Sequence, residues 1–282
     1  MALSIVIAGG GCRAFWCLGA YDALADVIGE PLEFAGVSAG AAMATMVAAG
    51  RAAETFVHFR EAVSRNGRNF HPKRWLSRKT AFPHEAMYRD TLEFTLADGG
   101  YERLMAGPSV RILQASVQPG EAMVPTVLRA MQAYSKRKAE GRLHAPDGAP
   151  RGMSWRVAVA QEAATPAQLI DEVITSSATW PVTNLPRHGG RTWVDGGLVD
   201  NVPVRALSAR ARSGAVLVFL TRPYDTKLLS SDQGRLYLAP SEPVPVKKWD
   251  YTRADLLLAT FDRGRRDGQA ARDRVKSLLA GT

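Results

Sequence analysis

Two short apolar segments near the N-terminus each run directly into a glycine-rich turn, and this feature most constrains the fold. Leu3–Ala8 leads into Gly9-Gly10-Gly11, and Glu33–Val37 leads into the sequence Gly-Val-Ser-Ala-Gly that ends at Gly40. A helical pattern of apolar residues follows each turn. Strand, helix, strand, helix within about fifty residues predicts a parallel α/β sheet.

The remaining chain continues this alternation. Further strands are expected at Val110–Ala115, Arg156–Gln161, Thr192–Val194, Val216–Thr221 and Leu236–Ala239. Helices are expected at Phe15–Val27, Ala39–Ala49, Ala52–Ser64, His84–Leu96, Ala122–Glu140, Ala167–Ser177 and Thr252–Leu279, with Thr165-Pro166 as one helix start. The loop-like stretch Gly141–Gly152 is interpreted as a surface insertion, because strands continue on both sides. We therefore expect a single domain over residues 1–282, a length that suits one large core.

Composition and charge narrow the classes of partner. Hydrophobic residues make up 46% of the chain and charged residues 22%, which excludes wholesale disorder. The net charge of +9 favours an anionic partner, either nucleic acid or a lipid surface. Arg65–Lys79 contains six Lys and Arg residues together with Phe70 and Trp75, which suits a membrane interface, although most charged runs are simply solvated. A second basic run lies at Lys136–Arg142.

Cysteines and apolar segments bear on the compartment. The two cysteines, Cys12 and Cys17, give no disulfide framework and no zinc site, and a reducing compartment fits them. No apolar stretch approaches the roughly 20 residues of a spanning helix, and Leu3–Ala8 is too short for a signal peptide. We therefore expect a cytoplasmic protein without a cleavable signal, while export without such a signal would leave no trace here.

The first glycine turn, Gly9-Gly10-Gly11-Cys12-Arg13-Ala14, has three interpretations. Backbone N–H groups at a helix start form an anion site. Gly9, Gly11 and Ala14 satisfy the loose G-x-G-x-x-[GA] pattern of dinucleotide binding. The same turn suits an oxyanion hole for acyl transfer, or it is only a tight turn.

The second turn is a nucleophile elbow and favours acyl transfer. Gly36 and Gly40 flank Ser38 in the G-x-S-x-G pattern, between a strand and a helix as the elbow requires. A dinucleotide fold would need an acidic residue at the end of the second strand, but Glu33 stands at its beginning. Nucleotide binding becomes a minor alternative.

A third motif supplies a base for the serine. Asp195 ends a short strand and precedes Gly196 and Gly197, which leave its carboxylate open to a neighbour. No histidine follows Asp195, whereas α/β hydrolases place theirs after the acid. We therefore expect a Ser38–Asp195 dyad, and we expect structural or surface roles for His58, His71, His84, His144 and His188.

These three motifs together resemble the patatin-like phospholipase family over roughly residues 1–225. The segment from Ser176 to Pro181 and the run Asn201-Val202-Pro203 also look like the family's surroundings of its catalytic aspartate. The chain departs from the family at Ala14, where glycine is usual. The resemblance implies a three-layer α/β/α fold with a mostly parallel central sheet.

The resemblance also implies roles for the site residues. Ser38 would be the nucleophile and Asp195 its general base in the hydrolysis of lipid acyl esters of the phospholipase A or lysophospholipase type. Amides in the Gly9–Cys12 turn would form the oxyanion hole, with Arg13 holding the loop or a phosphate. No metal or other cofactor is expected.

Two other functions remain open: a soluble esterase or thioesterase with the same dyad, and a lipid-binding regulatory module. With no nucleic-acid motif present, an anionic membrane becomes the expected partner. Asn66–Pro83 is a hypothetical lid. The sequence indicates neither an oligomeric state nor a head-group preference.

Overall fold

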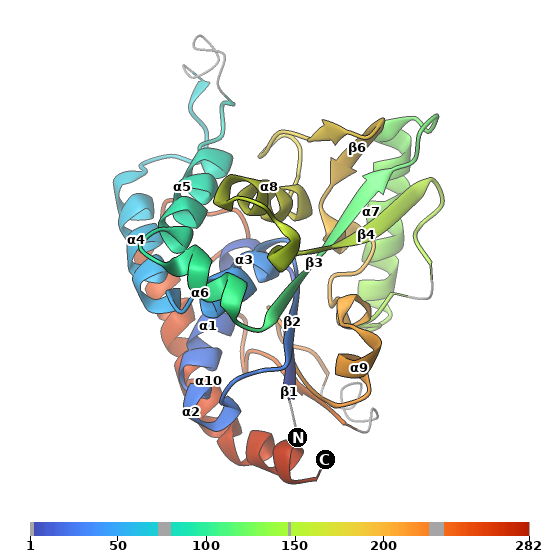
Figure 1. Cartoon of the computed structure of the whole chain (residues 1–282). Helices are drawn as coiled ribbons and strands as arrows, with labels where there is room; N and C mark the ends of the chain where they lie inside the picture. The colour runs from blue at the N-terminus through green and yellow to red at the C-terminus, as the bar shows by residue number, and fades with distance from the viewer. Residues whose placement is uncertain (1–2, 73–79, 146–147, 226–233, 282) are drawn as a thin grey trace.

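The chain folds around one eight-stranded mixed sheet (Figure 1). The computed structural model describes residues 3–72, 80–145, 148–225 and 234–281. Strands run in the order β5-β6-β3-β2-β1-β7-β8, and β4 pairs with β3 outside this path. The strands β1, β2, β3, β7 and β8 are mutually parallel, whereas β4 and β6 are antiparallel to β3. Their bounds are β1 Leu3–Ile7, β2 Glu33–Val37, β3 Ser109–Val117, β4 Met153–Val159, β5 Arg187–His188, β6 Arg191–Val194, β7 Ala215–Phe219 and β8 Arg235–Leu238.

Helices cover the sheet on both faces, so the expected three-layer α/β/α arrangement is confirmed (Figure 1). The side chains of β1 alternate between the layers: Ile5 and Ile7 join the larger core, and Val6 joins the smaller one. The helices of the larger layer are α1 Phe15–Asp22, α2 Ala25–Ile28, α3 Ala39–Ala48, α4 Ala52–Arg65, α5 His84–Leu96, α6 Gly100–Ala106, α8 Pro166–Ser176 and α10 Ala254–Ala280; α7 Met123–Ala139 and α9 Ala209–Arg212 lie on the opposite side.

The C-terminal helix α10 packs directly on α1. A Cβ atom added at Gly264 would lie 2.1 Å from the Trp16 carbonyl oxygen, and one at Gly19 would lie 2.0 Å from that of Phe261. The indole of Trp16 donates to Asp267 at 2.7 Å. Helix α10 therefore belongs to the same core as α1, the helix that follows the first glycine turn.

Most predicted elements are present, but some boundaries differ. The expected helix Phe15–Val27 is interrupted at Ala23, because Arg272 of α10 donates to the Ala23 carbonyl and also pairs with Asp26. Helix α6 was not predicted, since only Gly100 and Leu104 are buried in its seven residues. Strand β4 begins at Met153, three residues before the expected start.

Candidate active site

Strand β3 brings the predicted serine and aspartate together. Strand β4 occupies one edge of β3, so β2 and β6 share the other edge: Val37 lies opposite Leu113, and Val194 lies opposite Ala115. The next residues, Ser38 and Asp195, meet where the two strands end. The Ser38 Oγ donates to the Asp195 Oδ2 at 2.9 Å, and both side chains are buried.

The elbow holds Ser38 in a backbone conformation that residues other than glycine rarely adopt, with φ 54° and ψ −133°. The Ser38 N–H donates to the Ser176 hydroxyl at 2.8 Å, which in turn donates to the Leu113 carbonyl at 2.6 Å. A Cβ atom at Gly40 would lie only 2.2 Å from the Ile7 carbonyl, and one at Gly36 would lie 2.6 Å from the Gly40 carbonyl. Close backbone packing thus explains why the elbow needs these small residues.

The carboxylate of Asp195 is anchored by one oxygen and presented by the other. Its Oδ1 accepts the Gly197 N–H at 2.7 Å, while its Oδ2 accepts from Ser38 and, at 3.4 Å, from the Thr179 hydroxyl. A Cβ atom at Gly196 would lie 2.5 Å from the Leu113 carbonyl, so the turn also packs against β3. The arrangement points one acceptor oxygen at the serine hydroxyl.

The glycine turn lies beside the elbow, but not all of its amides are available. The Gly9 N–H donates to the Asn201 carbonyl at 3.1 Å, and the Cys12 N–H donates to the Lys248 carbonyl at 3.0 Å. Within the described residues, the Gly10 and Gly11 N–H groups have no hydrogen-bond acceptor. This narrows the predicted set of anion-binding amides to Gly10 and Gly11, because those of Gly9 and Cys12 are already engaged.

The neighbours of the turn fit its shape. Gly11 has φ +57°, and a Cβ atom there would lie 2.2 Å from the Lys248 carbonyl. The Arg13 Nε donates to the Gly10 carbonyl at 3.3 Å, a contact with the loop that Arg13 is expected to hold. Ala14 is buried with φ −68°, a conformation that alanine adopts without strain. Burial raises the pKa of the Cys12 thiol, which makes it a poor nucleophile at neutral pH.

Sequence reasoning assigned no role to three residues that support the site. Ser176 and Asn201 stand in the segments that carried the resemblance, and Thr221 follows the strand β7. The Asn201 Nδ2 and the Thr221 hydroxyl both donate to the Gly9 carbonyl, at 3.1 and 2.8 Å. Thr221 lies two residues beyond the end of β7, and this position was its available signal, whereas Ser176 and Asn201 were marked only by the segments that carried the resemblance.

The five histidines contact other groups. His84 bonds the Trp249 carbonyl, His144 bonds Tyr237, His58 bonds Asp90, His71 bonds Asn66, and His188 stacks on Trp193.

The hypothetical lid at Asn66–Pro83 falls partly on residues 73–79, outside the described residues, and it stays a prediction. At its base, the His71 N–H donates to the Ala81 carbonyl at 2.7 Å.

The model of the family described as patatin-like phospholipase matches residues 5–208, and the chain therefore belongs to that family. The family is one of lipid hydrolases, so membership supports lipid hydrolase activity. No curated protein matches the chain.

Three solved structures are similar to the chain at low sequence identity, and the first of them supports the fold. Human GIVD cytosolic phospholipase A2 aligns with a TM-score of 0.54 and 12% identity, covering 99% of this chain and 60% of that protein. VipD from Legionella pneumophila has a TM-score of 0.45 and 11% identity over 97% of this chain and 67% of its own. The type III effector ExoU has a TM-score of 0.34 and 13% identity, with coverages of 98% and 53%. The chain thus spans about half to two thirds of these proteins.

In the described part of the chain, no helix is both long and apolar enough to cross a membrane. The same residues contain no group of three or more His, Cys, Asp and Glu side chains suited to a metal ion.

Proposed function

We propose that the protein hydrolyses fatty acyl esters of lipids, as a phospholipase A or lysophospholipase, through a Ser38–Asp195 dyad. The observation that carries this proposal is the 2.9 Å hydrogen bond from the Ser38 hydroxyl to the Asp195 carboxylate. This hydrogen bond lies at the nucleophile elbow, where α3 begins, and beside the Gly10 and Gly11 N–H groups, which have no acceptor in the described structure. Nucleophile, base and oxyanion donors are the three parts that acyl transfer needs.

The reaction proceeds in two halves. Asp195 accepts the Ser38 proton as Oγ attacks the ester carbonyl, and the oxyanion faces the Gly10 and Gly11 N–H groups. The carbonyl re-forms, the C–O bond to the leaving alcohol breaks, and Asp195 returns the proton to that alcohol. Asp195 next takes a proton from water, which attacks the acyl-enzyme; Ser38 recovers a proton as the fatty acid leaves.

Product analysis by mass spectrometry on defined phospholipid vesicles tests this function. The wild type should release fatty acid and lysolipid, whereas Ser38→Ala should release neither, and the exposed control Ser213→Ala should match the wild type. Hydrolysis of a short soluble ester without any action on vesicles would indicate a soluble esterase or thioesterase instead. A chain inactive on both would be a lipid-binding module, and vesicle cleavage by Ser38→Ala would exclude the dyad.

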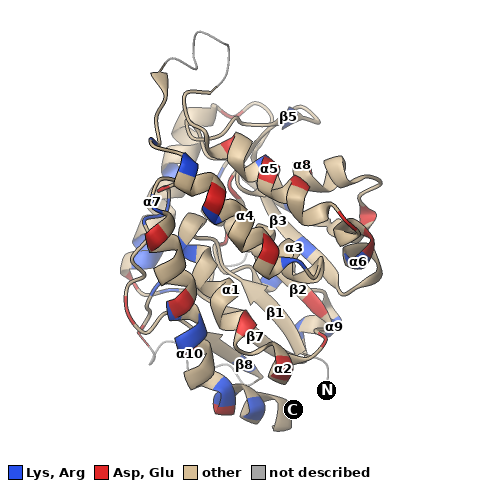
Figure 2. Ribbon diagram, turned by 90° about the vertical axis from the view of Figure 1, so that its left-hand side faces the viewer, with Lys and Arg blue, Asp and Glu red and all other residues tan. Residues whose placement is uncertain are grey.

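We also propose peripheral contact with an anionic membrane from the cytoplasmic side. Lys, Arg, Asp and Glu are interspersed along α4, α5 and α10, so that face carries mixed charge (Figure 2). Helix α7 differs: Val124, Leu128 and Met131 are 58%, 52% and 49% exposed, at spacings that place them on one side. The basic residues Lys136 and Lys138 follow in its last turn. Apolar side chains beside cations suit an anionic lipid interface.

Vesicle sedimentation tests this contact. Binding should weaken when salt rises or when phosphatidylglycerol is replaced by phosphatidylcholine, because surface charge attraction is screened over about 10 Å at 0.1 M salt. Leu128→Gln should reduce binding, while the control Leu258→Gln on α10 should not. Binding unaffected by salt, lipid charge and Leu128→Gln would mean that α7 does not face the membrane.

A further inference from the structure

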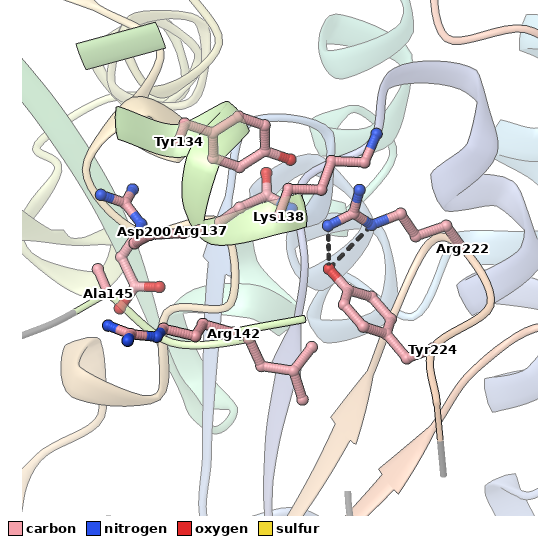
Figure 3. A pocket seen from close by; sticks show the side chains of 10 residues that line it. Tyr134, Arg137, Lys138, Arg142, Ala145, Asp200, Arg222 and Tyr224 are labelled. Atoms are coloured by element: carbon pink, nitrogen blue, oxygen red, sulfur yellow. Dashed lines mark hydrogen bonds between the residues drawn. The ribbon is translucent and has the colours of Figure 1, made fainter. Parts of the chain in front are cut away.

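A pocket rich in cations lies next to the active site (Figure 3). Its walls come from the end of α7 and the segment after it, from the turn that follows Asp195, and from the loop after β7. The polar side chains that argue for a ligand are Tyr134, Arg137, Lys138, Arg142, Arg222 and Tyr224. Four of these six are cationic, which is unusual for side chains so close together.

The positive charge of this pocket is not balanced from within. Asp200 is the one carboxylate among its lining residues, and that group is committed: Oδ2 accepts from Arg205 at 2.9 Å, and Oδ1 accepts the Val202 N–H at 3.1 Å. Arg142 pairs with Glu140 at 3.3 Å. Over the described ranges, neither Lys138 nor Arg222 has a carboxylate partner.

Arg222 is oriented by a neutral group. Its Nε and Nη2 donate to the Tyr224 hydroxyl at 2.9 and 2.5 Å, and its guanidinium lies 4.6 Å from the centre of the Tyr224 ring. Figure 3 shows Lys138, Arg222 and Tyr224 along one part of the pocket, with Arg142 and Asp200 across from them. A fixed guanidinium, an ammonium and two phenol groups form the donor set that phosphate oxygens accept from.

The pocket shares a wall with the oxyanion turn. Asn201 lines it and donates to the Gly9 carbonyl, and Thr221, which donates to the same carbonyl, directly precedes Arg222. Burial above all, together with the charge of Arg222, lowers the pKa of the nearby Arg13 guanidinium. The pocket is therefore connected to the glycine turn through Asn201, which lines it, and through Thr221, which precedes Arg222.

We propose that this pocket binds a phosphate group; where that phosphate is the head group of the lipid being cleaved, the pocket selects phosphate-bearing lipids over neutral acylglycerols. The inference rests on the proposed acyl hydrolase function and adds the side chains that recognise the phosphate, Arg222 and Lys138 above all. The phosphate belongs to the head group of the lipid being cleaved or to a separate phosphorylated ligand. The chemistry is the same for both, and the experiment distinguishes them.

The test compares two substrates with identical acyl chains, phosphatidic acid and diacylglycerol, dispersed in neutral detergent micelles at constant ionic strength. The wild type should favour phosphatidic acid in kcat/KM. Arg222→Gln should reduce kcat/KM for phosphatidic acid roughly tenfold or more, the usual scale for a lost charge-assisted hydrogen bond, and that for diacylglycerol much less. Lys138→Gln, at an exposed position on α7, gives a second variant in which folding is not at risk. Arg210→Gln on α9 removes the same charge elsewhere and should leave both rates unchanged.

Added inorganic phosphate identifies the source. Competitive inhibition of phosphatidic acid cleavage alone would assign the pocket to the substrate's head group. An Arg222-dependent change in diacylglycerol cleavage would assign it to a separate phosphorylated ligand. If Arg222→Gln and Lys138→Gln reduced kcat/KM equally for both substrates, or for neither, phosphate binding in the pocket would be contradicted. Neither result would bear on the proposed dyad. Failure of the proposed hydrolase function would be recognised separately, because the wild-type protein would then cleave neither substrate.

Discussion

The dyad and the basic pocket lie side by side, yet they are built in opposite ways. Ser38 and Asp195 are placed by backbone: two strands end at neighbouring positions on one edge of β3, and tight glycine turns fix the side chains. The pocket is placed by side chains of α7 and of the loop after β7, with Arg222 oriented by Tyr224. Chemistry that requires a fixed geometry is thus carried by the sheet, whereas charge that attracts an anion is carried by longer, more adjustable side chains.

The largest expected effect is the loss of kcat in Asp195→Asn, on the dyad side of the comparison. The amide can still accept the Gly197 N–H, so the fold should survive, but it cannot take the Ser38 proton. Loss of a general base should reduce kcat by roughly 10² to 10⁴-fold. Turnover of a chromogenic acyl ester measures it, with circular dichroism as the control for folding. Near wild-type turnover would show that another group activates Ser38.

The next test concerns the backbone packing that places the elbow. Gly40→Ala would put a Cβ atom 2.2 Å from the Ile7 carbonyl, and neither backbone segment can move without disturbing β1. We expect a loss of about 3 kcal/mol in the free energy of unfolding, the upper range for overpacking. Urea denaturation measures it. Gly67→Ala, where no atom lies within 4 Å of the added Cβ, should be neutral, and equal stability of the two variants would contradict the packing argument.

The same contrast explains what could be predicted from the sequence. The turns around Ser38 and Asp195 leave local signals, because glycine spacing and strand ends are contiguous in the chain. The positions of β1, β2, β3 and β7 along the chain followed from apolar runs for the same reason, whereas their order in the sheet did not. The pocket left no such signal: Tyr134, Asn201 and Arg222 are far apart in sequence, and only the fold assembles them. The engagement of the Gly9 and Cys12 amides likewise depends on Asn201 and Lys248, which no local pattern connects to the turn.

A smaller effect should follow Ser176→Ala. The hydroxyl accepts the buried Ser38 N–H and donates to Leu113, so its loss leaves both groups unpaired at a cost of about 1–3 kcal/mol of stability. Because Ser176 positions the elbow, kcat should fall while KM changes little. The matched control is Ser4→Ala, since the Ser4 hydroxyl is equally buried but has no hydrogen-bond partner in the described structure. A variant as stable and active as Ser4→Ala would show that the elbow holds its shape without Ser176.

The last expected effect lies on the pocket side, at Asp200, and is a dependence of stability on pH. Burial raises its pKa from the ordinary value of 3.8 to about 6, although Arg205 opposes the shift. Between these two values the folded chain holds more protons than the unfolded chain, so the contribution of Asp200 to stability falls as pH rises, by at most about 1.4 kcal/mol per pH unit. Urea denaturation from pH 4 to 7 should show this slope in the wild type and in the exposed control Asp273→Asn. In Asp200→Asn the free energy of unfolding should no longer fall with pH in this way. The missing ion pair with Arg205 would change the stability by a constant amount but would not restore the slope. An unchanged slope in Asp200→Asn would mean that the carboxylate stays ionised throughout, and that it already offsets part of the pocket's positive charge at low pH.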